Sequence, residues 1–208
     1  MSGVAKATGQ ETGAGCQVYL IGPPAADLEV LAPALEAALA AGDIVAFRLR
    51  AAAAAPETAQ ALQRICAGRV AFLLQDEVDL ALALGADGVH LGDPTRVREA
   101  RARLGPDRIL GASCGGSRHA AMLAGEDGAD YIAFGELGRP PRPELLELIE
   151  WWSELFVLPC LAEGAFDRGE LERLAGSADF IGVSDKVWRH PDGAAAGVRS
   201  MLDTIAGA

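Results

Sequence analysis

The sequence predicts an α/β protein built as a single (β/α)8 barrel. Short apolar runs alternate with helical patterns along residues 17–206, and eight such pairs occur, with about 24 residues in each. Strict alternation indicates parallel strands joined by right-handed crossovers, and eight units close most naturally into a barrel. A doubly wound open sheet is the alternative, but it usually has fewer strands, and no G-x-G-x-x-G follows the first strand.

The predicted strands are short apolar segments, and the predicted helices between them carry start and stop signals. Helix starts are marked by Asp27, Pro56 and Thr95, and helix ends are followed by Gly42 and Gly105. The strands are expected at Gln17–Ile21, Ile44–Leu49, Val70–Leu74, Asp87–Leu91, Arg108–Gly111, Asp130–Phe134, Phe156–Ala162 and Asp179–Val183. The helices are expected at Asp27–Ala40, Pro56–Ala67, Glu77–Leu84, Thr95–Leu104, Ser117–Glu126, Pro143–Leu155, Asp167–Ala175 and Ala194–Ile205.

A repeated motif of a small residue, alanine, aspartate, any residue and an apolar residue supports this arrangement. Its aspartates are Asp87, Asp130 and Asp179, and each stands where a helix ends and a strand begins. These positions belong to the amino-terminal rim of a barrel, where residues usually serve stability. We therefore expect the three carboxylates to act as loop or cap residues.

Composition limits the classes of partner. The chain of 208 residues has a formal net charge of −11 and no basic stripe, which excludes nucleic acid and disfavours an anionic membrane surface. Residues 1–16 have no apolar core and are expected to be a disordered lead-in rather than a signal peptide. The four cysteines have no zinc-like spacing, which predicts reduced side chains and a cytoplasmic protein. The oligomeric state stays open, with a homo-oligomer among the alternatives.

In parallel barrels, ligands bind at the carboxyl ends of the strands, and polar residues gather there in this sequence. Arg48 and Arg50 end the second strand; an inward arginine there could bind a phosphate or a carboxylate, or form a buried ion pair with Asp76 or Glu163. Asp76, after the third strand, could ligate a divalent cation or cap a helix.

Further polar residues end the remaining strands. His90 is expected to be a hydrogen-bonded core residue, with a catalytic role as the alternative. Lys186 could bind phosphate or carry imine chemistry, or form a salt bridge with Asp185 or Glu163. Glu163 and Lys186 could also form an acid–base pair for a changed chemistry.

Several blocks, in this order and spacing, resemble thiamine-phosphate synthase and the related TenI-type thiazole tautomerase. They span residues 17–202, and the most specific are Ala86-Asp87-Gly88-Val89-His90-Leu91-Gly92 and Gly128-Ala129-Asp130-Tyr131-Ile132-Ala133-Phe134-Gly135. The resemblance implies a (β/α)8 barrel that joins hydroxymethylpyrimidine diphosphate to thiazole phosphate with the help of Mg²⁺, and releases diphosphate. The partner is then a small phosphorylated metabolite.

The resemblance also implies roles for particular residues. Arg50, Asp76 and Ser113 correspond to catalytic positions, and Asp76 to a magnesium ligand. Substrate or phosphate binding is expected at Arg48, Arg139, Glu163, Gly164 and Lys186.

The sequence departs from the family pattern at some of these strand ends. The family's Gln-x-Arg-x-Lys is Arg48-Leu49-Arg50-Ala51-Ala52, its second magnesium aspartate is Thr95, and the histidine of the tautomerase is absent after Ser113. Two functions therefore remain open: a divergent synthase, and a catalytically degenerate barrel that binds a thiamine-related or other phosphorylated metabolite in a regulatory role.

Overall fold

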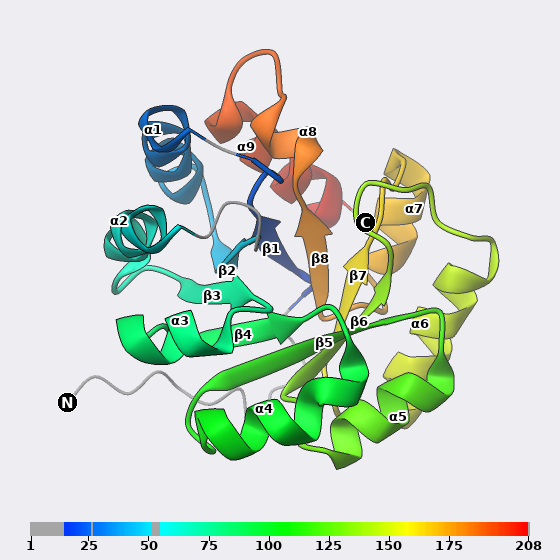
Figure 1. The fold of residues 1–208 in the computed structure, drawn as a ribbon. Coiled ribbons are helices and arrows are strands. Elements are labelled where there is room, and N and C mark those ends of the chain that lie inside the picture. Colours follow the sequence, from blue (N-terminus) through cyan, green and yellow to red (C-terminus); the bar gives the residue numbers. More distant parts are fainter. Residues whose placement is uncertain (1–14, 26, 51–54, 208) are drawn as a thin grey trace.

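Eight parallel strands close into a barrel in the order of the chain, from β1 round to β8, in the computed structural model of the protein (Figure 1). The structure describes residues 15–25, 27–50 and 55–207. The strands are β1 (Gln17–Ile21), β2 (Ile44–Leu49), β3 (Ala71–Gln75), β4 (Gly88–Leu91), β5 (Ile109–Gly115), β6 (Tyr131–Gly135), β7 (Cys160–Glu163) and β8 (Phe180–Val183). The predicted barrel is confirmed. Most of the predicted lead-in, residues 1–14, lies outside the described residues.

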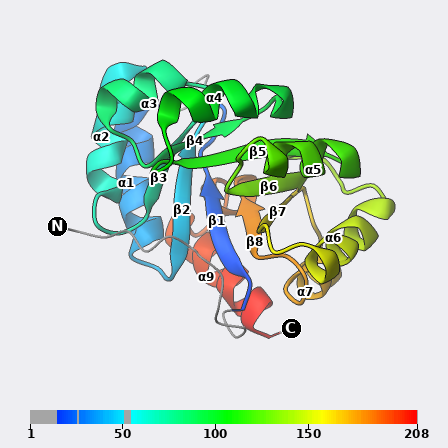
Figure 2. The ribbon, with the colours of Figure 1, turned by 90° about the horizontal axis from the view of Figure 1, so that it is seen from below.

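Helices surround the barrel, as a second direction of view also shows (Figure 2). They are α1 (Leu28–Leu39), α2 (Pro56–Cys66), α3 (Val78–Leu84), the 3-10 turn η2 (Pro94–Arg96), α4 (Val97–Leu104), α5 (Arg118–Glu126), α6 (Glu144–Leu155), α7 (Arg168–Leu174), α8 (Asp185–Trp188) and α9 (Ala194–Ala206). Within the described part of the chain, no helix is both long and apolar enough to cross a membrane.

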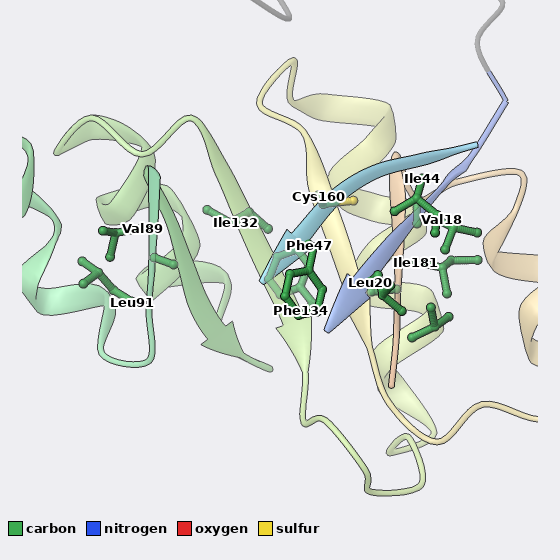
Figure 3. Close-up of a cluster of buried hydrophobic side chains, with 14 of the residues drawn as sticks. Val18, Leu20, Ile44, Phe47, Val89, Leu91, Ile132, Phe134, Cys160 and Ile181 are labelled. Carbon is green, nitrogen blue, oxygen red and sulfur yellow. The ribbon is translucent and has the colours of Figure 1, made fainter. Parts of the chain in front are cut away.

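The strands alternate between two environments, because successive side chains of a strand point to opposite faces. Val18 and Leu20 of β1 face outward into a large core between strands and helices, which Figure 3 shows in part. Tyr19 and Ile21 belong instead to a smaller cluster inside the barrel. Because both faces are buried, each strand reads as a nearly continuous apolar run.

The three repeated aspartates hold the amino-terminal ends of neighbouring strands together, as expected from the motif. The carboxylate of Asp87 accepts a hydrogen bond from the Phe72 amide at 2.8 Å. Asp130 and Asp179 do the same for the amides of Leu110 and Cys160, each at 2.8 Å. The motif therefore links each strand to its neighbour in the barrel.

Two predicted strands differ most from the structure, and one helix was not predicted. β5 continues to Gly115, four residues beyond its predicted end at Gly111. β7 begins at Cys160 rather than at Phe156. The Phe156 ring stacks on Trp152 with centroids 4.0 Å apart, which holds this residue against helix α6 instead of in the sheet. The polar turn expected after β8 contains the short helix α8, where Val187 is buried and the Trp188 indole donates a hydrogen bond to the Ile21 carbonyl at 2.6 Å.

Candidate active site at the carboxyl end of the barrel

The predicted site residues lie in four places near the carboxyl ends of the strands. Arg48 and Glu163, with Ser113, belong to a polar group inside the barrel, and Arg50, Gly164 and Lys186 line one pocket. Asp76 stands between β3 and β4, and Arg139 lies in the loop after β6. Their roles in binding or catalysis remain predictions.

A buried ion pair crosses the barrel interior. Arg48 of β2 is 2 % exposed and Glu163 of β7 is 4 % exposed, and the Arg48 Nη1 atom lies 2.8 Å from Glu163 Oε1. Burial alone would lower the pKa of Arg48, but the neighbouring carboxylate raises it above its ordinary value. Of the alternatives that the sequence leaves open for an inward arginine of this strand, the structure contains the ion pair, formed by Arg48 with Glu163.

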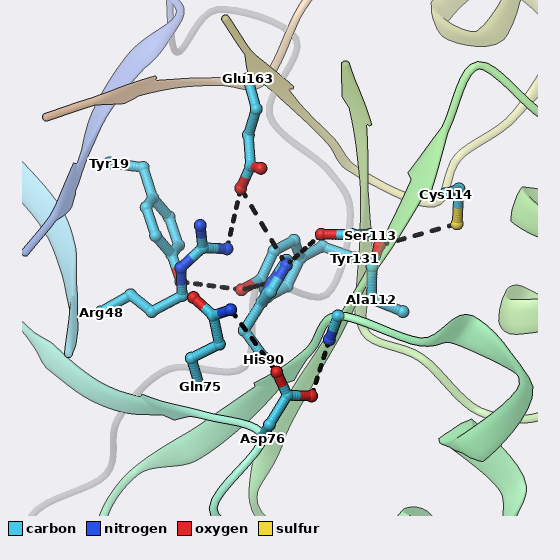
Figure 4. Close-up of polar contacts among 11 residues, drawn as sticks. Tyr19, Arg48, Gln75, Asp76, His90, Ala112, Ser113, Cys114, Tyr131 and Glu163 are labelled. Atoms are coloured by element: carbon cyan, nitrogen blue, oxygen red, sulfur yellow. Dashed lines mark hydrogen bonds and ion pairs between the residues drawn. The ribbon is translucent and has the colours of Figure 1, made fainter. Parts of the chain in front are cut away.

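Four side chains form a hydrogen-bonded chain beside this ion pair, which we call the interior chain (Figure 4). The Tyr19 and Tyr131 hydroxyls are 2.8 Å apart, and the Tyr131 hydroxyl lies 2.8 Å from His90 Nδ1. His90 Nε2 in turn lies 2.9 Å from Ser113 Oγ. The interior chain thus runs through Tyr19, Tyr131, His90 and Ser113, which come from β1, β6, β4 and β5.

The interior chain is uncharged. Burial, and then the charge of Arg48, lower the pKa of His90 well below its ordinary value. Burial raises the pKa of Tyr19 to about 12 and the pKa of Tyr131 well above its ordinary value. His90 is therefore a neutral, hydrogen-bonded core histidine, as the sequence favours.

Glycine at position 111 makes room for this arrangement. A Cβ atom on Gly111 would lie 2.1 Å from the Tyr131 ring, so no larger residue fits under that ring without a shift. Gly111 is paired with His90 on one side and with Tyr131 on the other. The strand register therefore brings His90, Tyr131 and Ser113 together.

Asp76 joins the ends of β3 and β4. It has φ of 61°, a left-handed conformation that aspartate tolerates better than most residues. Its Oδ1 atom accepts a hydrogen bond from the Gly92 amide at 2.8 Å, and the Gln75 side chain donates to Oδ2 at 3.5 Å. Arg96 stands 3.9 Å from the same carboxylate.

A pocket of about 190 Å³ opens between the ends of β2, β7 and β8. Three cations and one carboxylate line it together with the backbone of two strand ends: Arg50, Lys186, Arg189 and Asp185, with Gly164 and Ser184. Within the described residues, Lys186 forms no ion pair, because Asp185 pairs with Arg189 at 3.6 Å. The excess of cations over carboxylates in this lining favours an anionic ligand.

Arg139 lies apart from this pocket. It lines a second cavity of about 510 Å³ between the loops that precede α5 and α6. Its guanidinium is 3.1 Å from Glu136, and its side chain is mostly exposed. The loop is nonetheless tied to the pocket, because the Arg139 carbonyl accepts a hydrogen bond from the Ala165 amide at 2.7 Å.

The protein groups available to a metal ion are few. In the described part of the chain, no three His, Cys, Asp or Glu side chains stand together as a metal site. Mg²⁺ is commonly bound by one or two carboxylates, with phosphate oxygens and water completing its shell. The single carboxylate of Asp76 therefore fits Mg²⁺ only as a shared ligand with a bound phosphate.

Sequence reasoning did not assign the two tyrosines a place in the site. Tyr19 and Tyr131 are the only tyrosines of the chain, and each lies in an otherwise apolar strand run. A phenol at an inward position of such a strand needs a hydrogen-bond partner. This requirement is the sequence signal that could have placed both tyrosines in a polar group inside the barrel. Cys114 ends the same strand as Ser113 and is a buried thiol: burial raises its pKa to about 12, which disfavours a reactive thiolate.

Comparisons with known proteins agree on one family. A family model described as thiamine monophosphate synthase matches residues 18–187. The chain is 44% identical over 205 residues to the thiamine-phosphate synthase of Rhodospirillum centenum, with 92% of this chain and 99% of the relative covered. It is 43% identical over 203 residues to that of Hyphomonas neptunium, with 89% and 91% covered.

Solved structures give the same fold. Thiamine phosphate pyrophosphorylase from Pyrococcus furiosus superposes with a TM-score of 0.78 at 25% identity, over 92% of this chain and 96% of that one. Orotidine 5'-phosphate decarboxylase from Pyrococcus horikoshii superposes with a TM-score of 0.71 at 13% identity, over 91% and 100%. The second likeness concerns the fold alone.

Proposed function

We propose, because this chain belongs to the thiamine monophosphate synthase family, that it joins hydroxymethylpyrimidine diphosphate to thiazole phosphate. In this reaction the bond from the pyrimidine methylene carbon to diphosphate breaks, and a bond from that carbon to the thiazole nitrogen forms. Diphosphate is released. A cytoplasmic location belongs to this proposal and stays a prediction, and the oligomeric state stays open.

The pocket of Arg50, Gly164 and Lys186 is the observation that carries the proposal. Three cations (Arg50, Lys186 and Arg189) outnumber its one carboxylate (Asp185) around the carboxyl ends of barrel strands, where enzymes of this fold bind their substrates. Phosphate is a multiply charged anion that needs such compensation in a partly enclosed site. Gly164 leaves the Phe166 ring in place beside the pocket, because a Cβ atom at position 164 would lie 2.8 Å from that ring.

The remaining predicted residues fit supporting roles. Asp76 would hold Mg²⁺ together with phosphate oxygens, and the metal would supply positive charge to the leaving diphosphate. Arg50 and Lys186 would bind phosphate groups, and Ser113 would offer a hydroxyl to the substrate. Arg48 and Glu163 would line the inner end of the site as a neutralised pair rather than bind phosphate directly.

Two substitutions test these assignments in a synthase assay. We expect Arg50→Gln and Asp76→Asn each to lower kcat/KM about tenfold or more, because a charged hydrogen bond to the transition state is worth about 1.5–3 kcal/mol. Arg98→Gln and Asp127→Asn are matched controls, since these residues form an ion pair in the helix layer, between α4 and the end of α5. Full activity in Arg50→Gln and Asp76→Asn would contradict the assignments.

A regulatory barrel without catalysis is the second candidate. The observation that favours it is the Arg48–Glu163 pair, which fills the barrel interior with an internal contact where a substrate ring could otherwise enter. This candidate predicts that thiamine phosphate or a precursor raises the melting temperature by mass action without any product. A third reading, an acid–base pair of Glu163 and Lys186, is not supported, because within the described residues Glu163 pairs with Arg48 instead.

A further inference from the structure

We propose that the Arg48–Glu163 ion pair fixes the direction of the interior chain, so that the Ser113 hydroxyl is held as a hydrogen-bond donor toward the open end of the barrel. His90 is then a positioning residue that acts through Ser113. That Ser113 meets substrate rests on the proposed function, whereas the direction of the chain does not.

The interior chain has two possible directions. In the first, Tyr19 donates to Tyr131, Tyr131 donates to His90 Nδ1, and His90 Nε2–H donates to Ser113. In the second, every link is reversed, and Nδ1 of His90 carries the proton. A neutral imidazole has one N–H and one acceptor nitrogen, so His90 transmits a single direction along the whole chain.

The cation stands at the Tyr19 end. The Arg48 guanidinium carbon lies 5.8 Å from the centre of the Tyr19 ring, and its charge acts to lower the pKa of that phenol. A cation attracts the lone pairs of the hydroxyl oxygen and repels the hydroxyl hydrogen. The O–H bond of Tyr19 therefore points away from Arg48. Tyr131 is the hydrogen-bond partner of that hydroxyl within the described residues, so the hydrogen of Tyr19 goes to Tyr131.

The anion lies near the His90 end of the interior chain while it also contacts Arg48. Glu163 Oε1 lies 4.0 Å from His90 Nε2 and 2.8 Å from Arg48 Nη1. A carboxylate at that distance favours a hydrogen on Nε2 over a lone pair. The Arg48 charge lowers the pKa of His90 and so keeps the ring neutral with a single proton, and the Glu163 carboxylate near Nε2 favours that nitrogen as its place. Together with Arg48 beside Tyr19, this supports the first direction, in which His90 carries its proton on Nε2.

This direction decides what Ser113 offers. When Ser113 accepts from His90 Nε2–H, its own hydrogen is left to point elsewhere, and the side chain is only half-buried, unlike that of His90. A donor at this place favours an anionic ligand, whereas the reverse direction would leave only oxygen lone pairs facing it. The ion pair would in this way prepare Ser113 for a phosphate oxygen.

The ring nitrogens of His90 report the direction in nuclear magnetic resonance, because a protonated and a bare imidazole nitrogen give well-separated ¹⁵N signals. With uniformly labelled protein and no substrate, we expect Nε2 of His90 to carry the proton and Nδ1 to be bare. A proton on Nδ1, or signals averaged over both forms, would overturn the proposal. The outcome does not depend on whether the chain turns over any substrate.

The double variant Arg48→Gln/Glu163→Gln tests whether the ion pair sets the direction of the interior chain. Removing both charges avoids leaving one of them buried alone, and we expect the two His90 nitrogen signals to move toward each other as both forms become populated. His119 and His190 serve as internal controls, and Arg98→Gln/Asp127→Asn as a matched variant on the surface. Unchanged His90 signals in a folded double variant would show that the ion pair does not set the direction. If that variant does not fold, the unsubstituted protein still decides which nitrogen carries the proton.

Discussion

At the scale of single residues, we expect the largest change in the free energy of unfolding when one partner of the Arg48–Glu163 ion pair is removed. Both ions are buried, and Arg48 Nε and Nη1 lack hydrogen bonds of good geometry within the described structure despite the short distance to Glu163. A buried pair of this kind contributes little net stability, but the loss of one partner leaves an uncompensated charge.

Glu163→Ala is therefore expected to lower the free energy of unfolding by about 3 kcal/mol or more. The apolar pair Arg48→Met/Glu163→Leu should lie much closer to the unsubstituted protein, since it leaves no charge behind. Urea unfolding of the three proteins measures the difference. Equal destabilisation by the single and the double variant would show that packing, and not the buried charge, dominates.

His90 gives the fold a pH dependence. Burial and the Arg48 charge keep its pKa well below its ordinary value, whereas in the unfolded chain it takes up a proton near pH ~6.5. The unfolded state then binds more protons than the folded state at lower pH. The stability contribution is therefore present above about pH 6.5 and is lost as the pH falls below it, by up to about 1.4 kcal/mol per unit.

Urea midpoints at about pH 7.5 and about pH 5.5 isolate this effect. We expect His90→Gln to lose about 1 kcal/mol less than the unsubstituted protein between the two conditions. His119→Gln is the control, because that side chain is exposed and should leave the pH dependence unchanged. The same drop in all three proteins would contradict a low pKa of His90.

At the scale of elements, the repeated aspartates explain why neighbouring strands keep their register. Asp87→Ala leaves the Phe72 amide without its partner, and we expect a loss of about 1–2 kcal/mol in the free energy of unfolding with ligand binding unchanged. Asp107→Ala on the same side of the barrel is the control, since the structure gives this exposed carboxylate no hydrogen bond or ion pair. A loss of similar size in both variants would speak against the cap.

The alternation of strands and helices could be predicted from the sequence. Each helix buries one apolar stripe, which gives a periodic pattern, and each strand buries both faces, which gives a short apolar run. The start of β7 was not readable, because Phe156 and Val157 look like strand residues and only the stacking of Phe156 on Trp152 assigns the first of them to the helix layer. Helix α8 was missed because its four residues are too few to show a period.

At the scale of the whole molecule, barrel closure decides which predicted residues meet. Arg50 and Lys186 are far apart in the sequence, but closure places the end of β2 near the ends of β7 and β8, so both cations line one pocket with Gly164. Sequence reasoning identified these strand ends but not their distances. It placed Arg139 in the same group, whereas the loop after β6 carries it to a separate cavity beside α5 and α6.

The most direct measurement is product formation by the purified chain. Hydroxymethylpyrimidine diphosphate, thiazole phosphate and Mg²⁺ are incubated with it, and thiamine phosphate and diphosphate are quantified by mass spectrometry. We predict equal amounts of both products, formed in proportion to enzyme and prevented by removal of Mg²⁺. Binding of the phosphorylated compounds to the folded protein without any thiamine phosphate would contradict the synthase and leave the regulatory barrel.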